Sequence, residues 1–322
     1  MLVPSSRGRR LGRARLPLVL VVLVVLLAQA CDADRGAPAE QAPRGVRVAS
    51  FDFVESRLLA EVYASALERA GYPVVRLPGL GPREIVAPAL QQGHVDLVPE
   101  YVGSALRFYD GARPPAATSV PELQVALVDA LRGRGLTALA PAPGQDQNGV
   151  VVTRTTARTR GLSAVSDLSA HADGLSFGGP PECPERPLCL GGLQDLYGLR
   201  FRTFVAFPSR AATAEALLAG QLDVGMLETV DPYLGDGRLV LLTDDLGLQP
   251  PENVVPVLRQ AVVDGAGPDL LRVLDGVTAT LTTAGMVGLN RSVVLEHAAL
   301  PDVAADWVGS NGLGVRDERG GP

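Results

Sequence analysis

The sequence is poor in several residue types that build common active sites. Its 322 residues include no lysine, three cysteines and three histidines, and aromatic residues make up only 4%. His94, His171 and His297 are scattered and give no metal-ligand spacing. Two further thiols, Cys183 and Cys189, fall short of the four ligands that structural zinc usually takes. We therefore expect no metal and no cofactor. Because aromatic residues are rare, one placed in a polar turn is a candidate for binding.

Positive charge is also unevenly placed. The formal net charge is −6, and the first 30 residues contain five arginines but no aspartate or glutamate. Without that segment the remaining chain carries −11. An acidic body argues against nucleic acid as a partner and favours cationic ligands. The length and the hydrophobic content of 47% suffice for two domains, each with its own core.

The N-terminus lacks an apolar run long enough for a transmembrane helix. The run at 18–28 follows an arginine-rich region, which predicts a secretory signal peptide over 1–30. A small residue precedes Cys31, as lipoprotein processing requires, and acyl chains on Cys31 would anchor the protein to a membrane. The alternative is an incidental cysteine after an ordinary cleavage site. Residues 31–45 are rich in Pro, Ala and Gly, which predicts a lipidated, disordered tether.

Strand and helix patterns alternate after the tether. Apolar spacing predicts a helix that begins at an N-cap, Ser56, and ends at Gly71. Such alternation is typical of parallel strands joined by crossover helices. Strands are expected at 46–50, 73–78, 94–98, 150–153, 203–207 and 221–227, and further helices at 82–92 and 209–220.

Two distant segments, "LQQGHVDLVPEY" and "LLAGQLDVGMLE", share the pattern Leu-x-x-Gly-x-x-Asp. Two copies are too few for a solenoid, so they indicate two similar α/β lobes. Five residues after the aspartates, Asp96 and Asp223, come Tyr101 and Glu228. Ligands of such lobes bind beyond the carboxyl ends of the strands. We therefore expect Tyr101 and Glu228 to face one cleft, while the aspartates hold strand ends.

Several segments together resemble a known family. They are "LGPREIVAPALQQGHVDLVPEYVGSAL", "APAPGQDQNGVVVT", "GGPPECPERPLCLGGLQDLYGL" and "LGLQPPENVVPVLR". In this order they resemble the osmoprotectant (glycine betaine, choline, proline betaine) substrate-binding proteins of ABC importers, over 46–309. The resemblance implies an α/β, two-lobed clamshell, the type II periplasmic-binding-protein fold, joined by two hinge strands. Lobe 1 would comprise 46–148 plus 251–322, and lobe 2 would comprise 149–250.

The resemblance also implies a function without chemistry on the ligand. The chain would be an extracytoplasmic lipoprotein on the outer face of the cell membrane. It would act as a monomer that captures a small organic cation or betaine and delivers it to an ABC permease. Hinges are expected near Asn148–Val152 and Pro250–Val255. One alternative is a ligand-sensing receptor with the same clamshell. Another is a hydrolase using Ser176 in "GLSFG", which we disfavour because the Pro-rich stretch that follows cannot begin the helix of a nucleophile elbow.

Family members hold a trimethylammonium group in a cage of aromatic rings, whose negative faces attract a cation that cannot donate strong hydrogen bonds. The family's Glu-Tyr-Thr-Gly-Thr motif matches Tyr101 and retains a hydroxyl at Ser104, and Arg186 matches the arginine that receives a ligand carboxylate. Two positions where the family has aromatic residues carry Asn148 and Glu228 instead. From the resemblance and from this chain's departures from it, the expected ligand-binding residues are Phe51, Tyr101, Ser104, Asn148, Arg186, Glu228 and Asp231.

We therefore expect an organic cation, choline-like or an amine with N–H donors, held by Tyr101, Phe51 and Glu228. Each residue also has a structural alternative. Tyr101 and Phe51 could belong to the core, Glu228 could pair with Arg210, and Arg186 could be an ordinary surface residue. A local disulfide is expected between the two cysteines of the Pro-rich loop, Cys183 and Cys189.

Overall fold

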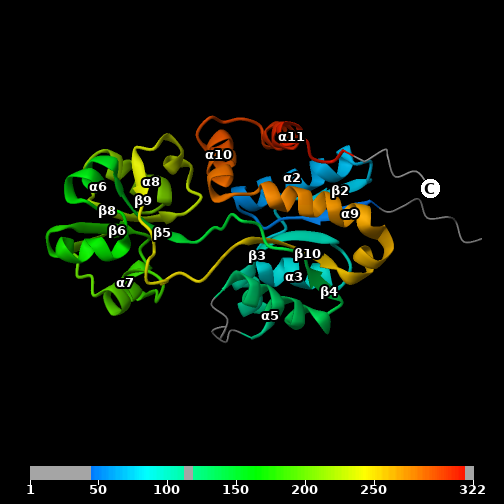
Figure 1. Cartoon of the computed structure of the whole chain (residues 1–322), viewed down its shortest axis with the longest axis horizontal. Helices are drawn as coiled ribbons and strands as arrows, with labels where there is room; N and C mark the ends of the chain where they lie inside the picture. Colours follow the sequence, from blue (N-terminus) through cyan, green and yellow to red (C-terminus); the bar gives the residue numbers. More distant parts are fainter. Residues whose placement is uncertain (1–44, 112–118, 316–322) are drawn as a thin grey trace, which may run out of the picture. The chain divides into compact units, whose positions relative to one another are not determined.

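The computed structural model describes residues 45–111 and 119–315. The predicted signal peptide at 1–30, Cys31 and the tether up to residue 44 lie outside these described residues. Two five-stranded sheets organise the described part, and helices flank each of them (Figure 1).

The first sheet has the strand order β2-β1-β3-β10-β4. Its central strand β3 pairs with β1 in parallel and with β10 in antiparallel orientation. The strands are β1 (Val46–Ala49), β2 (Val74–Leu77), β3 (Leu97–Tyr101), β4 (Leu136–Ala138) and β10 (Val254–Arg259). The accompanying helices are α2 (Val54–Arg69), α3 (Arg83–Gln91), α4 (Val102–Tyr109), α5 (Val120–Arg132), α9 (Gln260–Thr280), α10 (Thr283–Val294) and α11 (Leu300–Ser310).

The second sheet has the order β7-β6-β8-β5-β9. Its central strand β8 pairs with β6 in parallel and with β5 in antiparallel orientation. The strands are β5 (Asn148–Thr153), β6 (Ser176–Gly179), β7 (Thr203–Ala206), β8 (Val224–Glu228) and β9 (Leu239–Leu241). The helices are α6 (Arg154–Arg160), α7 (Leu190–Tyr197) and α8 (Arg210–Leu218), with short 3-10 turns η1 (Val165–Ala170), η2 (Ala172–Gly174), η3 (Cys183–Glu185) and η4 (Pro232–Asp236).

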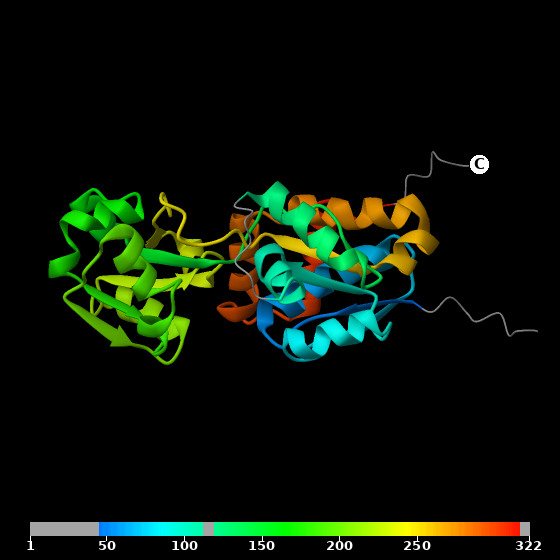
Figure 2. The ribbon, with the colours of Figure 1, turned by 90° about the horizontal axis from the view of Figure 1, so that it is seen from below.

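The two sheets have the same topology, which confirms the expectation of two similar α/β lobes. β1, β2, β3, β10 and β4 correspond in order and direction to β6, β7, β8, β5 and β9. The chain passes from the first sheet to the second before β5 and returns before β10 (Figure 2). The parallel strands expected from the alternation are confirmed for β1, β2 and β3 and for β6, β7 and β8. By contrast, β10 and β5 run antiparallel to their neighbours. These are the strands that the two crossings enter.

Two predicted boundaries are also wrong. The first helix begins at Val54 with Phe53 as N-cap, and Ser56 lies inside it, where its hydroxyl accepts the N–H of Phe51 at 2.9 Å. The strand expected at 94–98 is β3, which starts only at Leu97 and ends at Tyr101. The physical reason is that the N–H groups of residues 94 and 95 still bond back to the carbonyl of Ala89 at the end of α3.

Each lobe buries its own apolar core. The larger core lies around α2, which packs on α9 and α11 and buries Leu58, Leu59 and Leu67. The fully buried Tyr63 shares a hydrogen bond with Thr278 of α9 at 2.8 Å, so its hydroxyl is satisfied inside this core. Of the helices within the described ranges, none is by itself long and apolar enough to cross a membrane. The pair α9 and α10, bent by 86°, meets that test only when taken together.

Candidate functional site

The two central strands end at equivalent positions. The last residue of β3, Tyr101, pairs with Val254 at the start of β10, and the last residue of β8, Glu228, pairs with Asn148 at the start of β5. The residue after each strand end donates its N–H to the crossing segment: Val102 to the carbonyl of residue 253 at 3.0 Å, and residue 229 to that of residue 147 at 2.9 Å. The two strands that follow the crossings, β10 and β5, thus fix the ends of β3 and β8.

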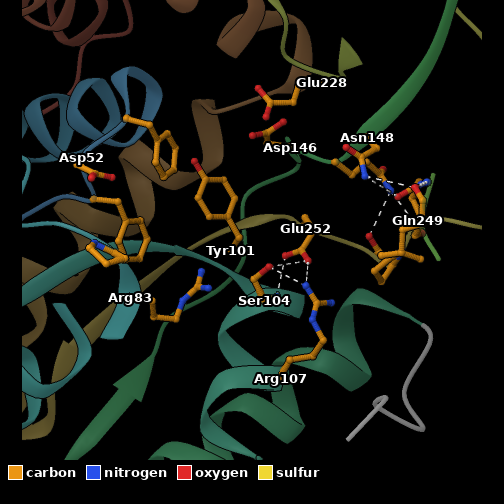
Figure 3. A pocket seen from close by; sticks show the side chains of 16 residues that line it. Asp52, Arg83, Tyr101, Ser104, Arg107, Asp146, Asn148, Glu228, Gln249 and Glu252 are labelled. Carbon is orange, nitrogen blue, oxygen red and sulfur yellow. Dashed lines mark hydrogen bonds and ion pairs between the residues drawn. The ribbon is translucent and has the colours of Figure 1, made fainter. Parts of the chain in front are cut away.

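A cavity of about 460 Å³ lies at these strand ends. Figure 3 shows its lining, to which both lobes contribute. Five of the seven predicted ligand-binding residues line it: Phe51, Tyr101, Ser104, Asn148 and Glu228. The full lining is Phe51, Asp52, Phe53, Pro82, Arg83, Tyr101, Ser104, Arg107, Asp146, Gln147, Asn148, Leu188, Glu228, Gln249, Pro250 and Glu252.

Three aromatic rings form a row on the lobe 1 side. The rings of Phe51 and Phe53 stack with centroids 5.9 Å apart, and those of Phe53 and Tyr101 lie 6.2 Å apart. Phe53 is 43% exposed, whereas Phe51 and Tyr101 are buried against the core. Phe51 belongs to the larger core and also lines the cavity, so its core interpretation does not exclude a place at the cleft. Ring faces attract cations.

The hydroxyl of Tyr101 is held by a buried network. It donates to Glu55 Oε1 at 2.6 Å, and Asn290 Nδ2 donates to Glu55 Oε2 at 2.8 Å. The same nitrogen lies 3.1 Å from the carbonyl oxygen of Val230, just after β8. Burial raises the pKa of Glu55 to about 7, although its two hydrogen bonds oppose the rise. The network fixes the ring of Tyr101 and ties α2 to α10 and the end of β8.

The two arginines of the lining are already paired. Arg83 forms an ion pair with buried Glu100 at 2.8 Å, and its guanidinium lies 5.1 Å from the centroid of the Phe51 ring. Arg107 pairs with Glu252 at 2.8 Å. Ser104 donates its hydroxyl to the same carboxylate at 2.9 Å. Positive charge in the lining is thus offset by neighbouring carboxylates.

Two carboxylates of the cavity lining, Glu228 and Asp146, lie close to each other. Glu228 forms an ion pair with Arg210 at 2.8 Å, with both side chains more than a third exposed, as its structural alternative predicted. Figure 3 shows Asp146 beside Glu228 and facing the hydroxyl end of Tyr101. Burial raises the pKa of Asp146 well above its ordinary value, and the charges of Glu55 and Glu228 raise it further. The cavity therefore joins aromatic rings to an acidic wall.

Polar amides complete the wall where the two crossings meet. Asn148 Nδ2 lies 3.4 Å from the carbonyl oxygen of Leu188 and 3.5 Å from Oε1 of Gln249. Gln249 Nε2 donates to the same carbonyl at 2.9 Å. Asn148 thus has protein partners and supplies a polar surface where the resemblance led us to expect a ring.

Two predicted residues lie outside the lining in the described part of the chain. The side chain of Arg186 is 60% exposed and pairs with Glu182 at 2.8 Å, as expected of a surface residue. Asp231 is buried, and its side chain accepts the N–H of Tyr233 at 3.0 Å and caps η4. Burial raises the pKa of Asp231 to about 6. In this structure neither side chain reaches the cavity.

The same region contains the expected disulfide geometry. Cys183 and Cys189 are bonded to each other, with their Cα atoms 5.2 Å apart. The hydrolase interpretation of Ser176 has no support. Ser176 begins β6 and donates its hydroxyl to Asp223 at 2.7 Å, so it fastens two strands and lies outside the cavity lining of the described residues. The described ranges contain no cluster of His, Cys, Asp and Glu that could hold a metal.

The sequence reasoning missed several lining residues. The sequence offered a signal for Phe53, because two aromatic residues flanking Asp52 are conspicuous in a chain with so few rings. Asp146 carried a weaker signal from its place in the "DQN" segment. No local pattern marks Arg83 or Arg107, which enter the lining through helix packing.

Comparison with known proteins decides the family. Residues 44–310 match a family model described as the substrate-binding domain of the ABC-type glycine betaine transport system. The chain belongs to this family. It is 30% identical over 273 residues to a glycine-betaine-binding protein of Pseudomonas aeruginosa, covering 82% of this chain and 86% of that one. To the glycine betaine-binding protein YehZ of Escherichia coli it is 27% identical over 283 residues, covering 84% and 92%.

Solved structures of related proteins have the same fold. The apo YehZ structure from Escherichia coli has a TM-score of 0.75 at 26% identity, covering 84% of this chain and 99% of that one. A structure described as a glycine betaine/carnitine/choline ABC transporter has a TM-score of 0.76 at 22% identity and covers 83% and 98%. The two-lobed, type II periplasmic-binding-protein fold expected from the sequence is confirmed. At this identity the second structure speaks for the fold alone.

Proposed function

We propose that this member of the glycine betaine transport family captures a small organic cation or betaine in the cavity between its lobes and delivers it to a membrane permease. In this proposal the lobes comprise 46–148 with 251–322 and 149–250, and they close on the ligand about the two crossings. The protein is an extracytoplasmic lipoprotein anchored through Cys31. It acts as a monomer and catalyses no reaction.

The row of rings opposite carboxylates carries this proposal. A methylated ammonium group presents apolar methyl groups and a diffuse positive charge, which suit ring faces such as those of Phe53 and Tyr101. Glu228 and Asp146 add negative potential on the other side of the cavity. A volume of about 460 Å³ lies within the range of ordinary small-molecule sites. An organic cation fits this chemistry better than an anion.

The pairing of Glu228 with Arg210 refines the role expected for that carboxylate. An ion pair between partly exposed side chains is weak, so Glu228 can turn toward a bound cation at little cost. We therefore assign Glu228 a supporting electrostatic role and the rings the main contact. The Asp231 carboxylate acts behind it, holding η4 in place.

A ligand screen followed by one matched pair of variants tests the proposal. Glycine betaine, choline, carnitine, proline betaine and methylated amines are screened by thermal shift, since a ligand of the folded form raises its melting temperature. Calorimetry then compares Phe53→Leu with Phe108→Leu. Both phenylalanines are partly exposed, at 43% and 37%, but only Phe53 lines the described cavity. Phe53→Leu should weaken binding of the best cation about fivefold, and Phe108→Leu should leave it unchanged.

Two results would contradict the proposal. One is that no cation or betaine raises the melting temperature. The other is that the two variants bind the best cation equally. A sensor would bind the same ligand with the same rings. Ligand uptake into vesicles that contain this protein and an ABC permease therefore distinguishes transport from sensing.

A further inference from the structure

One carboxylate of the cavity lacks a partner. Oδ1 of Asp146 is buried and has no hydrogen-bond partner among the described residues. Asp146 lines the cavity, and its backbone N–H donates to the carbonyl of Glu252 at 3.0 Å, which fixes the segment entering β5. A buried acceptor without a donor destabilises the folded protein. A ligand that brings a donor to this oxygen removes that destabilisation.

Nε of Arg210 is buried and has no hydrogen-bond partner among the described residues. The short contacts that the hydroxyl and guanidinium donors near the cavity do make go to carboxylates other than Asp146. These contacts are Tyr101 to Glu55 at 2.6 Å, Arg83 to Glu100 at 2.8 Å, Arg107 to Glu252 at 2.8 Å and Arg210 to Glu228 at 2.8 Å. The free acceptor is therefore available to a bound molecule.

The geometry points to Asp146 as the specificity-determining residue, whose carboxylate accepts a hydrogen bond from the N–H of a tertiary or secondary methylated ammonium ligand. The rings of Phe53 and Tyr101 receive the methyl groups. Asp146, which also lines the cavity, lies beside Glu228 and near the hydroxyl end of Tyr101 in Figure 3. A quaternary ammonium has no N–H and leaves the oxygen unpaired. The inference deepens the proposed function and rests on it.

Burial and the carboxylates that face Asp146 raise the pKa of its carboxyl group and so make ligand binding depend on pH. Burial keeps its carboxyl protonated to higher pH than usual, Glu55, Glu228 and Glu252 raise its pKa further, and Arg210 opposes them. A bound ammonium stabilises the carboxylate, so the carboxyl proton leaves to solvent while the ammonium keeps its own. Affinity should therefore rise with pH through the range in which this carboxyl group titrates.

The test compares two probes that differ by one methyl group. Choline is quaternary, whereas N,N-dimethylethanolamine carries one N–H in its place and stays protonated at neutral pH. The wild-type protein should bind dimethylethanolamine about tenfold more tightly than choline, as one charge-assisted hydrogen bond allows. Asp146→Asn should reduce the ratio to about threefold or less. Asp52→Asn, which removes an exposed carboxylate from the same lining, should keep the wild-type ratio.

The outcomes separate this inference from the proposed function. If neither probe, nor any betaine in the screen, binds the wild-type protein, the proposed function fails. If choline binds as tightly as dimethylethanolamine, or Asp146→Asn keeps the tenfold ratio, the function stands and the inference is wrong. Calorimetry of the wild-type protein with both probes gives the affinity ratio even if the variant does not fold.

Discussion

The two lobes place different chemistry at equivalent points of one topology. The central strand of the first sheet ends in Tyr101 and that of the second ends in Glu228, and each end is fixed by the same pair of contacts to a crossing segment. Asp96 and Asp223 precede these strands and each accepts the N–H of the neighbouring parallel strand. The shared backbone therefore sets where a side chain points, and the residue chosen there sets what it can bind.

The aspartates differ most in their surroundings, so they offer the largest contrast in stability. Asp96 receives two side-chain bonds of 2.7 Å from Arg47 and lies 3.0 Å from Nε of Arg259, with 6% of its side chain exposed. Asp223 is 40% exposed and bonds mainly to Ser176. Asp96→Asn should lower the free energy of unfolding by about 3 kcal/mol, and Asp223→Asn by about 1 kcal/mol. Urea denaturation at neutral pH measures both.

The same pair predicts a difference in acid. Burial opposes ionisation of Asp96, but the bonds and charge of Arg47 outweigh it and hold its pKa below the ordinary value. The stabilisation is therefore present above pH 4 and lost as pH falls through the lowered pKa. The gap between wild type and Asp96→Asn should close in that range. Equal losses for the two variants at neutral pH would break the comparison of the aspartates.

A second contrast concerns the acid behind Tyr101. The pKa of Glu55 is raised from 4.5 to about 7, so between these values the folded state holds more protons than the unfolded state. Stability therefore falls as pH rises through this window, by about 2 kcal/mol between pH 5 and 7.5. Glu55→Gln should remove that part of the slope in urea denaturation of the ligand-free protein. Glu84→Gln, at an exposed position of α3, should keep the wild-type slope. An unchanged slope in Glu55→Gln would show that the network does not hold the proton.

The smallest expected effects lie at the two strand ends themselves. Tyr101→Leu should weaken the best cation about tenfold because a ring is lost. Glu228→Gln should weaken it only about threefold, since its carboxylate is partly screened and shared with Arg210. Calorimetry on variants whose folding is checked by circular dichroism gives the order. If Glu228→Gln has the larger effect, the carboxylate and not the ring is the main contact. If Glu228→Gln leaves the affinity unchanged, Glu228 does not belong to the binding site.

Local sequence signals predicted the scaffold well because they report local backbone physics. Gly93 and Gly220 adopt φ values of 76° and 69°, a region that favours glycine, and they end the helices that lead into the two central strands. Counting from the aspartates then reached the correct strand ends. The count failed by three residues at the start of β3, because the chain after Gly93 still bonds back to its helix.

The partners in the site could not be predicted in this way. Glu55 reaches Tyr101 across 46 residues of sequence, and Asn290 reaches Glu55 across 235. The resemblance placed Arg186 at the ligand, yet its loop directs it to Glu182 at the surface. Such contacts depend on how α2, α10 and the loops pack, and no local pattern encodes them.

The sequence by itself determined the alternation of strands and helices, the duplicated strand ends at Tyr101 and Glu228, and the family to which the chain belongs. Only the tertiary structure decided that Phe53 joins the aromatic row, that Glu228 is paired and that Asp146 is not. The physical reason is that propensity and turn geometry act over a few residues. The charge balance of a buried cavity is instead set by side chains that folding brings together from distant segments.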